Sequence, residues 1–247
     1  MAKVHLITYG DKNYTKTKHR LVEEAKRTQW FSTITAYDQN DIDNDYKKEF
    51  KEVLNQPRGS GYWIWKSYFI LKRLKEIDED DILIYLDAGC TIHRMAHKRF
   101  YEYIGMLDTK CMIAFQMHHV EKHYTTKEIF EYFNVLEKED ITETGQCVGG
   151  IRIMKNNQET RSIMQLEYNT YKANKLLATD YYNNKQEPYF IDNRHDQSIF
   201  SVITKLNNNV MVLGDETNVH DTKTKQNFPF FASRIKDKKS IKRHHRR

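Results

Sequence analysis

A carboxylate stands at the end of an apolar run in the middle of the chain. Asp87 directly follows residues 82–86 and precedes Ala88 and Gly89, which are too small to shield a ligand from the backbone. Five consecutive apolar residues rich in strand formers are typical of a strand buried on both faces. Open α/β sheets bind ligands at the carboxyl ends of such strands. Asp87 is therefore a candidate ligand-binding residue, and a simple turn cap is the alternative.

A second segment, 56–66, places two cations around a glycine-rich loop. Gly61 contributes to the flexibility of the loop, and Ser60 is a candidate N-cap for the helix expected to follow. Arg58 precedes this helix and Lys66 lies in its first turns, which are apolar nearly all round. Such a helix start predicts an anion site. The alternative is a solvated Arg58 and a lysine whose stem is buried while its charge reaches water.

A third segment combines a late carboxylate with an apolar helix. Asp196 lies three residues before Ile199, on the apolar side of a helix expected to begin near Asn193. An inward carboxylate could serve as a base in a cleft, and a first-turn Asp favoured by the helix dipole is the alternative. Gly149 and Gly150 precede a further strand, where paired glycines allow another backbone or a ligand to approach closely.

The sequence lacks the motifs of several other enzyme classes. It contains no GxxxxGK[ST], GxGxxG or GxSxG, which argues against nucleoside triphosphatases, dinucleotide enzymes and serine acyl chemistry. His118, His119 and His123 follow one another closely, but nothing nearby completes a coordination set, so a polar loop is expected. The cysteines are widely spaced and are expected to be buried free thiols in a reducing compartment: Cys90, Cys111 and Cys147.

The elements that position these residues alternate between strand and helix. Strands are expected at 3–9, 32–36, 82–86, 112–115 and 210–213, with another ending near residue 154. Helices are expected at 16–29, 46–54, from the loop at 56–66 to about residue 75, and at 100–107, 129–136, 158–177 and from about 193. This alternation predicts one α/β domain over residues 1–235, with a mixed, mostly parallel sheet flanked by helices.

The charge of the chain is concentrated at its C-terminal end. The net charge is +6, but residues 236–247 contain seven Lys or Arg and one acidic residue. Removing these from the chain's 40 basic and 34 acidic residues leaves 33 of each. We expect a disordered basic tail that could hold the protein near an anionic lipid or acceptor, or that is merely solvated. No apolar run suits a signal peptide or membrane helix, so a soluble, cytoplasmic protein is expected.

Three blocks taken together resemble small GT-A-type nucleotide-sugar glycosyltransferases: YLDAGC at 85–90, RGSGYWIWK at 58–66 and RHDQSIF at 194–200. The resemblance spans about residues 3–221. It implies a GT-A, Rossmann-like domain that moves a sugar from a nucleotide-diphosphate-sugar, with UDP as the expected nucleotide. It also implies a hydroxyl of a glycan or other molecule as acceptor, and a place in polysaccharide biosynthesis.

The resemblance also implies roles for individual residues. A strand-end DxD in these enzymes holds the donor and a divalent metal; here Asp87 matches, and Gly89 stands in the place of the second carboxylate. His220 would complete the site for Mn²⁺ or Mg²⁺ with Asp87. Asp196 stands where an inverting enzyme carries its base, which would take the proton of the acceptor hydroxyl.

The donor and acceptor would contact further residues. The departing diphosphate must meet positive charge, either a metal or Lys66 and Arg58. The donor-binding set implied is Tyr9, Tyr37, Arg58, Gly61, Lys66, Asp87, Ala88 and Gly89, where the two tyrosines would stack on the base. The acceptor-binding set implied is Gly149, Gly150 and His195.

Two other functions fit single features of the sequence. The segment 86–90 (LDAGC) bears a faint likeness to a methyltransferase glycine loop, but Thr91 and Ile92 replace further glycines. The basic tail suggests nucleic-acid binding, but the neutral body has no interleaved basic and aromatic face, so no specific nucleic acid is expected as a partner.

Overall fold

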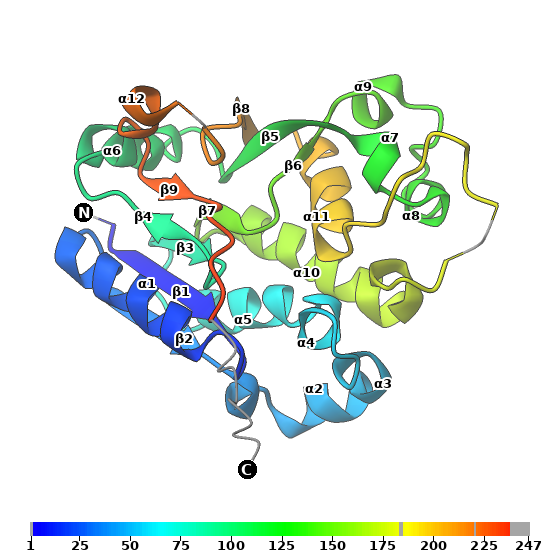
Figure 1. Cartoon of the computed structure of the whole chain (residues 1–247), viewed down its shortest axis with the longest axis horizontal. Helices are drawn as coiled ribbons and strands as arrows, with labels where there is room; N and C mark the ends of the chain where they lie inside the picture. The colour runs from blue at the N-terminus through cyan, green and yellow to red at the C-terminus, as the bar shows by residue number, and fades with distance from the viewer. Residues whose placement is uncertain (1, 183–184, 220, 238–247) are drawn as a thin grey trace, which may run out of the picture.

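The chain folds around one mixed sheet (Figure 1). The computed structural model describes residues 2–182, 185–219 and 221–237. Within these residues the sheet consists of β1 (Val4–Tyr9), β2 (Thr33–Tyr37), β3 (Ile82–Leu86), β5 (Met112–Val120), β6 (Gly145–Cys147), β7 (Ile151–Lys155) and β8 (Val210–Gly214). The strand order is β2-β1-β3-β7-β5-β6, and β8 pairs with β5. Only β6 and β7 run against the direction of the other strands, so the predicted mixed, mostly parallel sheet is confirmed.

Helices cover both faces of the sheet: α5 (Trp65–Leu74), α10 (Gln158–Ala173) and α11 (Asp196–Lys205) on one, and α1 (Thr15–Thr28) and α6 (His97–Met106) on the other. In β3, Leu83 and Tyr85 join the core under α5, while Ile82, Ile84 and Leu86 join the core under α1. All five side chains are buried, which confirms the expected burial of this strand on both faces.

Shorter elements fill the connections: α2 (Asn44–Glu49), α3 (Lys51–Leu54), α4 (Gly59–Tyr62), α7 (Glu121–Tyr124), α8 (Lys127–Tyr132), α9 (Glu139–Thr142), α12 (Thr222–Lys225), and the 3-10 turns η1 (Gln39–Asp41) and η2 (Lys175–Ala178). The helix expected at 46–54 is thus two helices, divided at Phe50. The strand expected at 112–115 continues to Val120, so His118 and His119 lie on a strand and not in a loop. Among the described residues, no helix has the length and apolar character needed to span a bilayer.

The glycine-rich loop before α5 forms a left-handed turn. Residues 59–63 all have positive φ, between 50° and 98°. The Trp63 N–H donates to the Gly59 carbonyl oxygen at 3.3 Å, and Tyr62 donates to Arg58 at 2.8 Å. The left-handed conformation costs a residue with a side chain roughly 1–2 kcal/mol, which explains the glycines at 59 and 61. The segment expected to be a loop thus forms a hydrogen-bonded left-handed turn.

Ser60 does not cap the helix that follows. It lies inside the left-handed turn, where its hydroxyl donates to Asp11 Oδ2 at 2.5 Å. Helix α5 begins at Trp65, and no side chain caps it. The candidate N-cap was therefore wrong, because the chain turns left-handed at Ser60 before it enters the helix.

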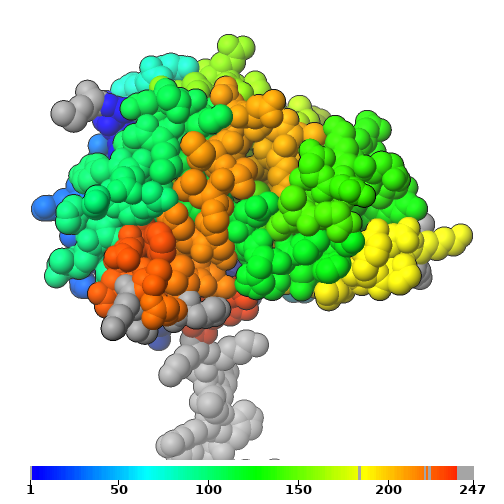
Figure 2. Space-filling model, turned by 90° about the horizontal axis from the view of Figure 1, so that it is seen from above, coloured from blue at the N-terminus to red at the C-terminus, as the bar shows by residue number. Residues whose placement is uncertain are grey.

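The last described residues return to the middle of the molecule. Strand β9 (Phe230–Phe231) pairs with β4 (Thr91–Ile92), and residues 232–237, which we call the C-terminal strap, continue from it (Figure 1). The Asp237 carboxylate accepts hydrogen bonds from the main-chain N–H groups of Lys16 and Thr17, both at 2.8 Å, at the start of α1. In Figure 2 the orange and red residues before the tail lie beside the teal residues of α6.

Candidate functional site

The Asp87 carboxylate lies at the carboxyl end of β3 and is partly open to solvent, with 38% of its side chain exposed. Its Oδ1 accepts a hydrogen bond from the Tyr85 hydroxyl at 2.6 Å and lies 3.3 Å from Lys66 Nζ. Its main-chain N–H donates to the Gly150 carbonyl oxygen at 2.8 Å. A Cβ at Gly150 would lie only 2.5 Å from Asp87 Oδ2, so glycine is required for this approach. The carboxylate is therefore held from one side, while the other is open.

Lys66 joins two of the predicted segments inside the protein. Its side chain is 2% exposed, and its ammonium group donates to Asp196 Oδ2 at 2.7 Å and to the Gly149 carbonyl oxygen at 3.1 Å. With the contact to Asp87, this places one cation between two carboxylates. The structure thus brings together the strand end, the helix after the glycine turn, and the late helix, all of which the sequence singled out separately.

Two buried residues that the sequence analysis missed complete this charge cluster. Arg152, on β7, is fully buried and forms two hydrogen bonds with Glu167, at 2.6 and 3.1 Å. It also lies 3.3 Å from Asp196 Oδ2 and donates to the Gly149 carbonyl oxygen at 3.2 Å. No clear signal of this burial was present in the sequence, because an arginine that alternates with Ile151 and Ile153 also suits a solvent-facing position; a buried arginine requires a charged partner.

Burial and the two cations have opposite effects on Asp196, which is 4% exposed. Burial is the larger effect and raises the pKa of Asp196 to about 6, although Lys66 and Arg152 act to lower it. Burial alone would lower the pKa of Lys66, but the carboxylates of Asp196 and Asp87 outweigh it and raise that pKa. Asp196 is therefore a carboxyl group that can change protonation near neutral pH.

A second cluster holds Arg58, which is 46% exposed, away from the first. Its guanidinium forms an ion pair with Asp180 at 3.0 Å and another with Asp192 at 3.5 Å. His195 Nε2 also lies 2.9 Å from Asp180, and the ring of His195 stacks on Tyr62 at 5.1 Å. His195 is buried with φ of 59°, so the acceptor contact expected of it has no exposed side chain to make it.

The two tyrosines expected to stack on a base are buried in the core. The ring of Tyr9 stacks on Trp65 at 3.8 Å, and that of Tyr37 stacks on Phe69 at 4.4 Å. Burial, followed by nearby carboxylates, raises the pKa of Tyr9. Their arrangement supports a structural role and does not support base stacking.

The glycine pair at 149–150 allows the close approach that the sequence predicted. A Cβ at Gly149 would lie 2.8 Å from Gln197 Cβ, and the Gly149 N–H donates to Gln197 Oε1 at 3.0 Å. Gln197 in turn donates to Gln146 Oε1 at 2.6 Å. Position 61 also requires glycine, because a Cβ there would lie 2.7 Å from Leu54 Cα.

The described residues do not provide a ligand set for a divalent metal at Asp87. They contain no cluster of three His, Cys, Asp or Glu side chains suited to a metal. Gly89 brings no carboxylate, Lys66 lies beside Asp87 Oδ1, and the Ala88 carbonyl oxygen accepts a hydrogen bond from Arg20 at 3.3 Å. His220, the other expected ligand, lies outside the described residues.

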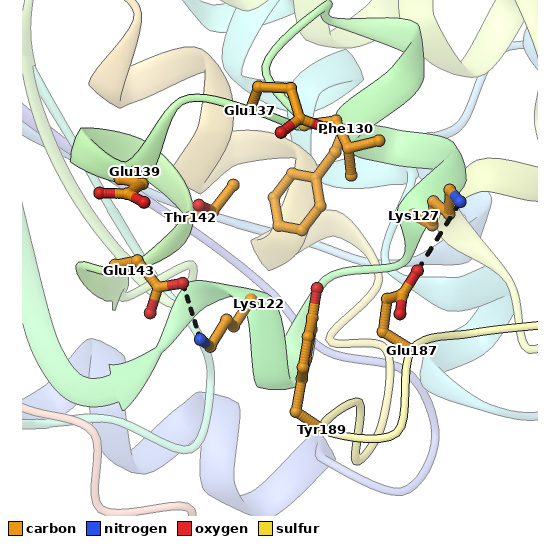
Figure 3. A pocket seen from close by; sticks show the side chains of 10 residues that line it. Lys122, Lys127, Phe130, Glu137, Glu139, Thr142, Glu143, Glu187 and Tyr189 are labelled. Carbon is orange, nitrogen blue, oxygen red and sulfur yellow. Dashed lines mark hydrogen bonds and ion pairs between the residues drawn. The ribbon is translucent and has the colours of Figure 1, made fainter.

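A separate hollow of about 310 Å³ lies among α7, α8, α9 and residues 187–189 (Figure 3). The ion pairs Lys122–Glu143, at 2.7 Å, and Lys127–Glu187, at 3.7 Å, line it. No residue of the Asp87 cluster is among its lining residues. It is therefore not the site to which Asp87 belongs.

The sheet, its helices and the position of Asp87 define a single α/β domain with the fold of GT-A-type glycosyltransferases. The chain is similar to the crystal structure of a glycosyltransferase involved in the glycosylation of the major capsid of PBCV-1, with 10% identity, 93% of each chain covered and a TM-score of 0.51. It is also similar to mouse xyloside xylosyltransferase 1 in its apo form, with 12% identity, 87% of this chain and 86% of that chain covered, and a TM-score of 0.50. Neither a protein-family model nor a curated protein matches the sequence. The likeness therefore shows the fold, and it does not favour the methyltransferase or nucleic-acid alternatives.

Proposed function

We propose that this protein is a glycosyltransferase that moves a sugar from a nucleotide-diphosphate-sugar, with UDP as the expected nucleotide, to a hydroxyl of a glycan or similar acceptor. The observation that carries the proposal is the partly exposed Asp87 at the carboxyl end of β3 in a GT-A fold. Ligands of α/β sheets bind at this edge. Because Tyr85 and Lys66 hold one side of the carboxylate, Asp87 offers its other side to the donor.

Asp196 is the proposed base, and the structure leaves it two roles. A pKa of about 6 suits a group that accepts a proton at neutral pH. Its burial and its contacts with Lys66 and Arg152 also suit a group that only holds Lys66 in place. The turnover of an Asp196→Asn protein separates these roles.

The metal and the membrane contact stay predictions. Coordination of Mn²⁺ or Mg²⁺ by Asp87 and His220 depends on a residue outside the described part of the chain. Contact with an anionic surface through the basic tail also stays a prediction, and residues 238–247 of that tail lie outside the described part of the chain. A cytoplasmic location also stays a prediction. A role in polysaccharide biosynthesis and the acceptor roles of Gly149, Gly150 and His195 rest on the sequence resemblance alone.

A thermal-shift screen against nucleotide-sugars, with and without Mn²⁺, tests the proposal. A donor at about 100 times its Kd stabilises a protein by about 2.7 kcal/mol, which raises the Tm of a domain this size by roughly 5–11 °C. Asp87→Ala should abolish this shift. Asp108→Ala is the matched control, since Asp108 is exposed and precedes the amino end of β5, at the opposite edge of the sheet.

Two results would contradict the proposed function. One is the absence of a shift with every nucleotide-sugar in both metal conditions. The other is an unchanged shift in a folded Asp87→Ala protein, because that would remove the residue on which the proposal rests. Stabilisation by S-adenosylmethionine instead would favour the methyltransferase alternative.

A further inference from the structure

The cations expected to meet the donor's diphosphate are already engaged. Negative charge grows on the diphosphate as the sugar leaves, so positive charge must lie beside it. Lys66 is enclosed between Asp196 and Asp87. Arg58 forms ion pairs with two other aspartates. A different source of positive charge is therefore required at this site.

The C-terminal strap lies where a side chain at position 89 would project. The Ile235 N–H donates to the Gly89 carbonyl oxygen at 3.1 Å. A Cβ at Gly89 would lie 3.0 Å from the Ile235 carbonyl oxygen and 3.4 Å from the Arg234 carbonyl carbon. A side chain at 89 would therefore press against the main chain of the strap, which would have to shift by a few tenths of an ångström. This contact gives a physical reason for glycine at the position where a second carboxylate was expected.

Contacts at both ends hold the strap over this loop. At its start, the Ala232 N–H donates to the Thr217 carbonyl oxygen at 2.9 Å. At its end, Asp237 accepts the hydrogen bonds at the start of α1, including one from the Thr17 hydroxyl at 2.6 Å. Between these anchors Arg234 adopts φ of 53°, a conformation that side-chain-bearing residues rarely take. The strap therefore fixes Arg234 directly beside the loop that contains Asp87.

Arg234 and Arg194 are cations for which the described part of the chain provides no carboxylate partner. Neither guanidinium forms an ion pair with a residue in the described ranges. Arg234 is exposed, and Arg194, two residues before Asp196, lies over the Tyr124 ring at 4.4 Å. Arginine without a carboxylate partner is well suited to bind phosphate oxygens.

The two arginines approach the same place on the sheet. Burial lowers the pKa of His119, and the positive charges of His118, Arg194 and Arg234 lower it further, against the opposing effect of Asp215. The Arg194 guanidinium lies over the Tyr124 ring, and that ring contacts the ring of His119, on β5, with 5.2 Å between centroids. The charge of Arg234 acts on the pKa of the same histidine. Because Arg234 adjoins Gly89 and Arg194 adjoins the start of α11, positive charge lies at two borders of the site.

We propose that Arg234 of the strap, together with Arg194, binds the donor's diphosphate and supplies the positive charge that GT-A enzymes commonly take from a divalent metal. The inference rests on the proposed function and deepens it. It follows from the absence, among the described residues, of a ligand set for a metal at Asp87. It also follows from Arg234, whose main chain adjoins Gly89, and from Arg194 at the start of α11.

Calorimetric titration with UDP and with uridine tests this inference, each in EDTA and in Mn²⁺. GDP and guanosine replace them if the screen selects a guanosine donor. The wild type should bind UDP in EDTA, and Arg234→Gln and Arg194→Gln should each weaken UDP binding by about 10- to 100-fold. Uridine affinity should not change, because it has no phosphate, and Arg234→Lys should retain part of the UDP affinity. Arg27→Gln, at an exposed position of α1, is the matched control and should bind UDP as the wild type does.

Each other outcome has a defined meaning. If the wild type binds UDP in Mn²⁺ but not in EDTA, the inference is overturned and the positive charge is assigned to a metal. Equal UDP affinities of Arg234→Gln and Arg27→Gln would also overturn it. Equal losses for UDP and uridine would show that Arg234 only holds the strap. Failure of the wild type to bind any nucleoside diphosphate would instead count against the proposed function.

Discussion

Replacement of Lys66 by methionine tests whether the buried charge cluster holds the site together. Methionine keeps much of the length and apolar character of the lysine stem but removes the ammonium group between Asp196 and Asp87. Loss of one partner of a buried ion pair costs about 3–5 kcal/mol, and Arg152, which still contacts Asp196, places this case near the lower value. A loss of about 3 kcal/mol lowers the Tm of a domain this size by roughly 6–12 °C.

The loss should depend on pH in a defined direction. Lys66 is one of the groups that lower the pKa of Asp196, so its removal raises that pKa further above the ordinary value of 3.8. A carboxyl group with a raised pKa in the folded state stabilises the fold below its unfolded pKa. That stabilisation is lost as the pH rises through the folded pKa. The Tm deficit of Lys66→Met relative to the wild type should therefore be smaller at pH 5 than at pH 7.5.

Thermal unfolding followed by circular dichroism at both pH values measures the effect. Lys172→Met is the matched control, because its ion pair with Glu49, at 3.0 Å, lies at the surface. Surface pairs contribute about 0–1 kcal/mol, so this variant should stay within roughly 4 °C of the wild type. A Lys66→Met deficit no larger than that of the control, or equal at both pH values, would refute the role given to the cluster.

Two further predictions concern the base and the end of the chain. Asp196→Asn should lower the transfer rate by about 10²- to 10⁴-fold with donor affinity nearly unchanged; near wild-type turnover with inverted product, read by NMR, would leave Asp196 only a structural role. A chain ending at Asp237 should keep its Tm and turnover on a small acceptor. A chain ending at Arg234 should have a lower Tm and a weaker donor affinity, since Ile235 and Asp237 anchor the strap. Equal Tm and donor affinity of the two truncated chains would contradict the role of the strap. The tail from 236 was expected to be dispensable, and the contacts of Asp237 move that boundary to residue 238.

Local patterns in the sequence predicted the elements that bring the site together. The apolar run at 82–86 predicted a buried strand, because consecutive apolar residues are a local signal of a strand buried on both faces. The position of Asp87 at its carboxyl end followed directly. The contact of Lys66 with Asp196 did not follow, because 130 residues separate them and only the folded sheet brings them together. Lys66 and Asp196 were each predicted as site residues, but the ion pair between them was not expected.

Other features could not be predicted from local patterns. Ile151 and Ile153, on either side of Arg152 in β7, face the core on one side of the sheet. The alternation therefore indicates that Arg152 faces solvent on the other side. Its burial depends on Glu167, which arrives from the following helix. The left-handed turn at 59–63 contains three residues with side chains, for which sequence preference favours other conformations. Tertiary contacts must stabilise both features, and such contacts are not visible in the sequence.

The charges of the cluster explain why cations are needed beyond it. Lys66 and Arg152 carry two positive charges, whereas ionised Asp87, Asp196 and Glu167 carry three negative ones. A diphosphate that approaches Asp87 therefore meets a cluster of net charge −1, or of zero charge when Asp196 takes up a proton. Neither state attracts an anion. The attraction must come from groups at the border of the site, where the main chain of Arg234 adjoins Gly89 and Arg194 lies at the start of α11.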